Sequence, residues 1–83
     1  MKHVILYSEH AVGRMMQRKI TVGEIEMVIN SPDGKIKQSK DKYVYYKKIP
    51  GRKDNLIAVV TANTGKTNTT EVITVMINFE VRE

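Results

Sequence analysis

The sequence predicts an α+β domain in which two short N-terminal helices pack on one face of an antiparallel β-meander sheet, in the order βααββββ. Apolar residues recur at helical spacing before Pro32 and at strand spacing after it. The chain has 83 residues, 41% of them hydrophobic, which suits one domain (residues 1–83) with one modest core. No apolar run approaches the roughly 20 residues that cross a bilayer. We therefore expect a cytoplasmic protein without a membrane partner.

The first half contains one predicted strand and two predicted helices. Residues 3–7 have strand character, and Ser8 is well suited to cap a helix that follows directly. Thr21 and Glu24 stand three residues apart and form a capping-box pattern, so the second helix is expected to start there. This helix ends before Pro32, because the residue preceding a proline is disfavoured in helical conformation.

Four strands are predicted beyond Pro32, near residues 35–39, 43–49, 55–62 and 71–80. The connection between the last two is polar and is expected to be a hairpin loop. In the last strand, alternate positions form an apolar set, which is Ile73, Val75, Ile77 and Phe79. This alternation predicts one apolar face along the whole strand, covered by the helices.

Positive charge is concentrated in one region. The formal net charge is +5, whereas residues 35–53 alone carry eight Lys or Arg and one acid, Asp41, which gives +7. Such a concentration is typical of proteins that bind a polyanion, with RNA as the first expected partner and an acidic protein as the second. A lysine-rich, solvated surface explains the same charges equally well.

A helix over residues 9–18 places His10, Arg14 and Arg18 on one side, at four-residue steps. An imidazole can transfer a proton near neutral pH, and guanidinium groups stay charged and match phosphate oxygens. Metal-independent RNA cleavage needs these parts, so we predict His10 as general acid or base and the two arginines as phosphate clamps. Thr74, on the less apolar face of the last strand, is predicted to add a hydrogen bond.

A purely structural role explains the same three residues. In this alternative the two arginines pair with acidic residues and His10 is a capping or half-buried helix residue. The acids that could serve as partners are Glu9, Glu24 and Glu26.

Aromatic and basic residues lie together in the second half. Tyr45 and Tyr46 are predicted to stack on RNA bases, and basic side chains near them are predicted to contact phosphates. These basic residues are Lys47, Lys48 and Arg52. Cross-strand packing explains the tyrosines equally well.

Other kinds of site have little support in the sequence. The chain has no Cys and only two His, so neither a metal site nor a cofactor is expected. Gly65-Lys66-Thr67 resembles the end of a P-loop, but the required first glycine is replaced by Val60. We therefore expect this segment to be a hairpin loop.

The order of residues in the first half resembles a bacterial family, the domain of unknown function four-two-five-eight. The resemblance rests on Tyr7-Ser8-x-His10-Ala11-x-x-Arg14-Met15-x-x-Arg18-x-Ile20-Thr21-x-x-Glu24-Ile25. It continues through Ile29-x-x-Pro32, the Tyr45-Tyr46 strand and Val72-Ile73-Thr74-Val75, so it covers nearly the whole chain. Gly13, inside the first helix, and Lys19, where a glycine is common, depart from the family pattern.

Members of that family are similar to the barnase, EndoU, colicin and RelE group of small ribonuclease folds, several of which are toxins. This resemblance implies metal-independent RNA cleavage by a toxin-type domain. The helix His, two helix Arg and final-strand Thr of the family fall on His10, Arg14, Arg18 and Thr74.

Two hypotheses follow from the sequence. The first is a toxin-type, RNase-like domain that acts on RNA. The second is a non-catalytic module that binds RNA or an acidic, antitoxin-like protein through the same basic surface. The chain is expected to be a monomer or a small homo-oligomer that pairs through an exposed edge strand.

Overall fold

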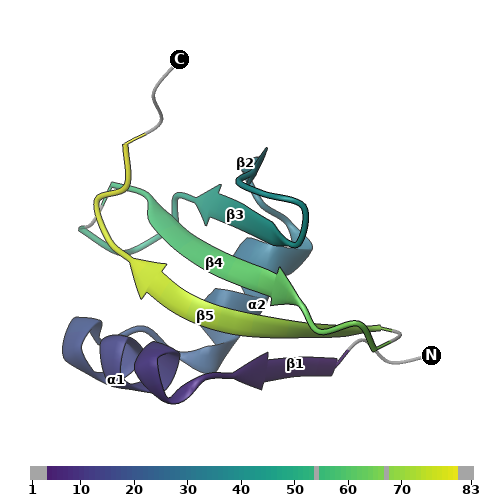
Figure 1. The fold of residues 1–83 in the computed structure, drawn as a ribbon. Coiled ribbons are helices and arrows are strands. Elements are labelled where there is room, and N and C mark those ends of the chain that lie inside the picture. Colours follow the sequence, from purple (N-terminus) through teal and green to yellow (C-terminus); the bar gives the residue numbers. More distant parts are fainter. Residues whose placement is uncertain (1–3, 54, 67, 81–83) are drawn as a thin grey trace.

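Two helices and one five-stranded sheet make up the structure, a computed structural model that describes residues 4–53, 55–66 and 68–80 (Figure 1). The elements in chain order are β1 (Val4–Tyr7), α1 (Glu9–Arg18), α2 (Val22–Asn30), β2 (Gly34–Lys37), β3 (Lys42–Lys47), β4 (Ile57–Asn63) and β5 (Thr69–Met76). Neither helix in the described part of the chain has the length and hydropathy of a membrane span. His3 of the predicted first strand and Thr67 of the predicted hairpin loop lie outside the described residues.

The sheet is mixed, so the predicted antiparallel meander is wrong. Its strands lie in the order β1-β5-β4-β3-β2, and β2 to β5 pair antiparallel. Strand β1 pairs parallel with β5, with Val4 opposite Thr69 and Tyr7 opposite Val72. All the elements between these two strands form the long connection that a parallel pair requires. Strand periodicity does not reveal the direction of a neighbour, which is why the sequence did not predict this pairing.

Both predicted helix caps are confirmed. The Ser8 Oγ accepts a hydrogen bond from the Ala11 N–H at 3.0 Å. The Thr21 hydroxyl accepts from the Glu24 N–H at 3.1 Å, while the Glu24 carboxylate accepts from the Thr21 N–H at 2.9 Å. These bonds satisfy N–H groups that have no partner within a helix.

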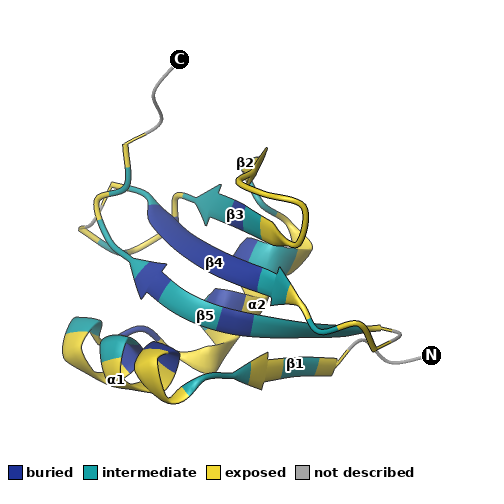
Figure 2. Cartoon of the chain, in the orientation of Figure 1, coloured by how far each residue is buried: buried dark blue, intermediate teal, exposed yellow. Residues whose placement is uncertain are grey.

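The main core lies between the helices and one face of the sheet (Figure 2). Helix α1 contributes Ala11 and Met15, and helix α2 contributes Ile25 and Val28. The buried strand residues of this core are Ile57, Val59, Val72 and Val75. Each large apolar side chain buried in this way stabilises the fold by about 1.5–3 kcal/mol.

A smaller apolar cluster lies on the opposite face of the sheet. It consists of Val44, Ala58 and Val60, packed under Tyr46, Met76 and Phe79. Residues 57–61 of the central strand β4 are therefore buried on both faces, as the dark blue β4 in Figure 2 shows. Burial on both faces explains why this strand is a continuous apolar run in the sequence.

A β-bulge in β5 changes which residues face the helices. Val60 lies opposite Thr74 but Thr61 lies opposite Val72, so Ile73 is an extra residue on β5. Val72 and Val75 consequently both point to the helices, and the predicted uniform alternation along the last strand is wrong. The strand also ends at Met76 instead of near residue 80.

Candidate functional site

The start of α1 is attached directly to β5. The Ser8 backbone N–H donates to the Val72 carbonyl at 3.0 Å, and the Ser8 hydroxyl donates to the Ile73 carbonyl at 2.8 Å. The same hydroxyl caps the helix through the Ala11 N–H. A single serine thus fixes the first turn of α1, including His10, against the bulge of β5.

The end of α1 is held by Arg52. Its guanidinium donates to the Lys19 carbonyl at 2.9 Å and to the Arg18 carbonyl at 3.2 Å. It also forms an ion pair with Glu24 at 3.3 Å, in which both side chains are less than one fifth exposed. Arg52 therefore satisfies the last carbonyls of α1 and ties that helix to the start of α2.

The electrostatics of Glu24 reflect this arrangement. Burial alone would raise the pKa of its carboxyl group, but hydrogen bonds from the Thr21 backbone and from Arg52 outweigh burial. The net result is a pKa below the ordinary glutamate value. Glu24, one of the three acids that could pair with the helix arginines, is thus paired with Arg52.

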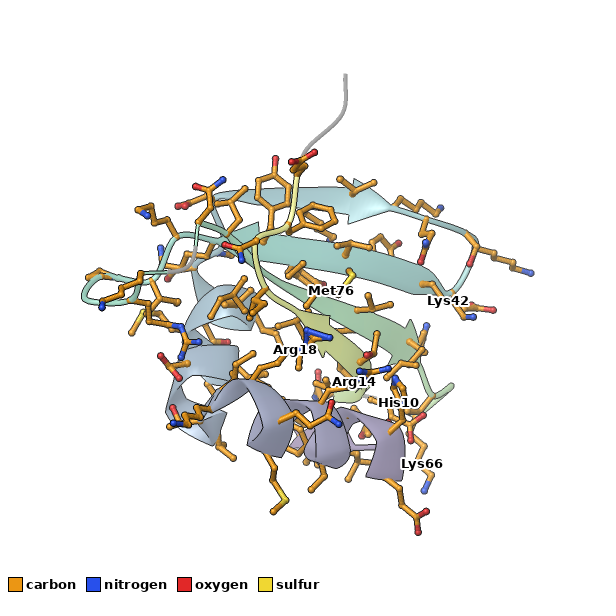
Figure 3. All side chains as sticks on the ribbon, turned by 90° about the vertical axis from the view of Figure 1, so that its left-hand side faces the viewer. His10, Arg14, Arg18, Lys42, Lys66 and Met76 are labelled. Atoms are coloured by element: carbon orange, nitrogen blue, oxygen red, sulfur yellow. The ribbon has the colours of Figure 1, made fainter. Side chains whose placement is uncertain are left out.

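His10, Arg14 and Arg18 leave α1 on the same side and form a row, which we call the α1 row (Figure 3). In this view Met76, at the end of β5, lies above the row. His10 is exposed, and the two arginines are half-buried. Both ends of the helix are fixed, so the spacing of the three side chains is set by a rigid element.

No ion pair involves the α1 row within residues 4–53, 55–66 and 68–80. The Arg14 guanidinium donates to the neutral Gln17 side chain at 3.2 Å. The Nε atom of Arg18 is buried and lacks a hydrogen-bond partner among the described residues. A donor left in this state is costly, and an anion bound at the guanidinium would offset part of that cost. Among the described residues, Arg14 and Arg18 therefore form no ion pair with Glu9, Glu24 or Glu26, the acids of the structural alternative.

Thr74 lies on β5 after the bulge. It is opposite Val60 and therefore faces the side of the sheet away from the helices, as Met76 does. If Ile73 were a regular strand residue, alternation from Val72 would turn Thr74 towards the helices. The bulge thus places Thr74 on the same face of the sheet as Met76, which Figure 3 shows above the α1 row.

The five predicted RNA-binding residues do not share one surface. Tyr45 and Tyr46 are neighbours on β3 and point to opposite faces of the sheet. Tyr45 packs against the main core, and Tyr46 packs against Phe79 with ring centroids 5.8 Å apart. The Tyr46 ring also lies where a side chain at Gly34 would be, so only glycine fits at this position on β2.

Two basic members of this predicted set, Lys47 and Arg52, use their side chains for contacts within the protein. The Lys47 ammonium pairs with Asp33 at 3.5 Å, and the Lys48 backbone N–H donates to the same carboxylate at 2.9 Å. The bond from Lys48, followed by the charge of Lys47, lowers the pKa of Asp33. Arg52 holds α1 and Glu24, as described above.

The sequence interpretation missed a depression of about 340 Å³ at the end of the sheet where β4 ends and β5 begins. Its walls include Tyr43 and Tyr45 of β3 and Lys66 of the following loop. The signal for it was the spacing of the two tyrosines, which puts both on one face of a strand. No cluster of three or more metal-ligating side chains occurs among the residues that the structure describes.

The fold and the site define the class of protein: a two-layer α+β domain with a mixed sheet and a helix that presents one imidazole and two guanidinium groups. The chain belongs to the family described as Domain of unknown function (DUF4258), whose model matches residues 7–77. This range contains the whole α1 row and Thr74. No curated protein and no solved structure matches the chain.

Proposed function

We propose that the protein is an RNase-like domain that binds RNA at the α1 row and cleaves it without a metal ion. The observation that supports this most is that His10, Arg14 and Arg18 project from one side of a fixed helix without an acidic partner among the described residues. Three side chains arranged in this way suit a phosphodiester, because the two cations attract it and the imidazole can transfer a proton.

The proposed reaction is the transfer of the phosphoryl group of a phosphodiester from the 5′-oxygen to the neighbouring 2′-hydroxyl, which gives a 2′,3′-cyclic phosphate. His10 accepts the proton of the 2′-hydroxyl, whose oxygen attacks phosphorus as the bond to the 5′-oxygen breaks. Water supplies the proton to that leaving oxygen. Arg14 and Arg18 stabilise the negative charge that gathers on the phosphoryl oxygens in the transition state. The Thr74 hydroxyl adds a hydrogen bond to the bound strand.

The test is cleavage of a short single-stranded RNA by the full chain in the presence of a chelator. His10→Ala is expected to lower the rate by about a hundredfold or more, the usual contribution of a positioned acid or base. Met16→Ala is the matched control, because Met16 is on the same helix and 76% exposed. A folded His10→Ala variant that cleaves RNA as fast as the Met16→Ala control would exclude the catalytic proposal.

A second candidate function is RNA binding without cleavage. It is favoured by the surroundings of His10, which has no hydrogen bond to a carboxylate within the described part of the chain that would orient it. In that case the wild-type protein binds RNA through Arg14 and Arg18 but leaves it intact. The same cleavage assay, combined with a binding measurement, separates the two candidates.

A further inference from the structure

The depression between β3, β4 and the loop that follows β4, which we call the loop pocket, lies apart from the α1 row. Figure 1 shows α1 beside the end of β5, whereas the loop before β5 is at the opposite end of that strand. The lining includes Tyr43, Tyr45, Thr61, Asn63, Lys66 and Thr70. Its volume of about 340 Å³ is at the small end of the range for ligand sites.

The electrostatics of the loop pocket favour an anion. Among the lining residues that the structure describes there is no acid, whereas Lys66 is one of them and its side chain is exposed. Lys35 adds a second positive charge from β2, with its ammonium 4.5 Å from the centre of the Tyr43 ring and 5.5 Å from that of Tyr45. A cation this close to two rings is attracted to their faces.

The walls of the loop pocket favour an aromatic group. Tyr43 and Tyr45 are on the same face of β3, and their ring centroids are 6.5 Å apart with a tilt of 38°. In the sheet, β3 with the two tyrosines lies between β2, which carries Lys35, and β4. The pocket therefore lies on the side of the tyrosines that faces β4 and β5, whose residues complete its lining. Asn63 adds a polar side chain to the lining, and its Oδ1 accepts from the Gly65 N–H at 2.9 Å.

We propose that the loop pocket binds one nucleotide, with the base against Tyr43 and Tyr45 and the phosphate at Lys66. Rings that stack on bases beside a cationic group are the usual means of holding an unpaired nucleotide. The nucleotide comes either from a free mononucleotide or from a single-stranded RNA. This inference goes beyond the cleavage proposal and does not depend on it, because none of its residues belongs to the α1 row.

The experiment is a titration of the ¹⁵N-labelled full chain with adenosine 5′-monophosphate, followed by NMR. The amides of Lys66 and Thr70 are expected to shift in a saturable manner. Tyr43→Leu removes a stacking partner of the base and Lys66→Ala removes the cation at the phosphate, so each is expected to weaken binding by about fivefold or more. Lys40→Ala, which removes an exposed lysine outside the pocket, is the matched control and should bind as the wild type does.

Further arms of the titration identify the source of the ligand and the part that is recognised. Tighter binding of a six-nucleotide RNA than of the mononucleotide supports RNA as the source, and the reverse supports a free nucleotide. Equal shifts with inorganic phosphate alone would overturn the proposal, since they would show that the base is not recognised. It would also be overturned if Lys66→Ala, a surface change in a loop, bound adenosine 5′-monophosphate as tightly as Lys40→Ala.

Discussion

Residues 35–53, which we call the basic stretch, carry a net charge of +7, whereas α1 contains two arginines, one histidine and one acid, Glu9. The structure places these charges in different settings. In the basic stretch Lys47 pairs with Asp33, and Arg52 holds Glu24 and the end of α1. In the α1 row no side chain is paired with an acid within the described residues, and all three leave one side of the helix.

The comparison teaches that the number of charges in a segment is a poor guide to where an anion binds. A strand sends neighbouring side chains to opposite faces, so Lys42 lies on one face of the sheet whereas Lys35, Lys37 and Lys47 lie on the other. A helix brings residues four apart to one face, so three groups form a continuous surface. The α1 row is therefore the better candidate for contact with a phosphate chain, although it carries less charge than the basic stretch.

Arg52→Ala is expected to have the largest effect on stability among the changes that probe this comparison. It removes hydrogen bonds to two carbonyls of α1 and the ion pair with Glu24, at a cost of about 2–3 kcal/mol in unfolding free energy. Urea unfolding measures this loss. Lys53→Ala is the matched control, because it removes a neighbouring exposed cation and should change stability by less than about 0.5 kcal/mol.

The same variant tests the sequence prediction that Arg52 binds RNA. With both proteins fully folded, Arg52→Ala should bind single-stranded RNA nearly as tightly as Lys53→Ala. Affinity that drops tenfold at unchanged stability would show that Arg52 contacts RNA and does not serve α1.

Ser8→Ala is expected to have an intermediate effect. It removes the cap of α1 and the hydrogen bond to the Ile73 carbonyl, which together contribute about 1–2 kcal/mol. Ser8→Thr keeps the hydroxyl and serves as the control in the same urea experiment. An unchanged denaturation midpoint for Ser8→Ala would show that this attachment does not fix α1 to β5.

The smallest expected effect concerns acid stability. The pKa of Glu24 is lower in the folded protein than its ordinary value of 4.5, so its contribution is present above that pH and is lost as the pH falls below it. Glu24→Gln retains the capping box but removes the charge. The variant should lose about 1 kcal/mol or less at pH 7 and show a flatter decrease in stability below pH 4.5. Parallel pH profiles for the two proteins would contradict this role of Glu24.

The sequence was sufficient for the local structure of the helices. Ser8, Thr21 and Glu24 are the residue types that satisfy free N–H groups at a helix start, and both helices begin there. The four-residue spacing of the α1 row also predicted correctly that its members share one side of a helix. These features depend on residues close together in the chain, and for that reason they can be read from it.

The sequence did not predict how the strands pair, nor which residues of β5 face the helices. The parallel contact of β1 with β5 joins distant segments, and strand spacing carries no information on direction. The extra residue Ile73 shifts the alternation of faces in the rest of β5 by one position. Nothing in the sequence distinguishes Ile73 from a regular strand residue. The RNA-binding set stays a prediction. It assumed that Tyr45 and the residues after it share a surface, whereas Tyr45 and Tyr46 point to opposite faces of the sheet.

The most direct test of the account is the salt dependence of RNA binding. We compare the wild type with Arg14→Ala/Arg18→Ala and with Lys40→Ala/Lys53→Ala, two double variants that remove the same charge. If the α1 row holds two phosphates, the first variant reduces the steepness of the fall in log affinity with log salt concentration by about 1.4, since each contact with a single strand contributes about 0.7. The second should lower it much less. An unchanged slope for the first variant, or an equal decrease for both, would contradict the claim that the α1 row is the RNA-binding site.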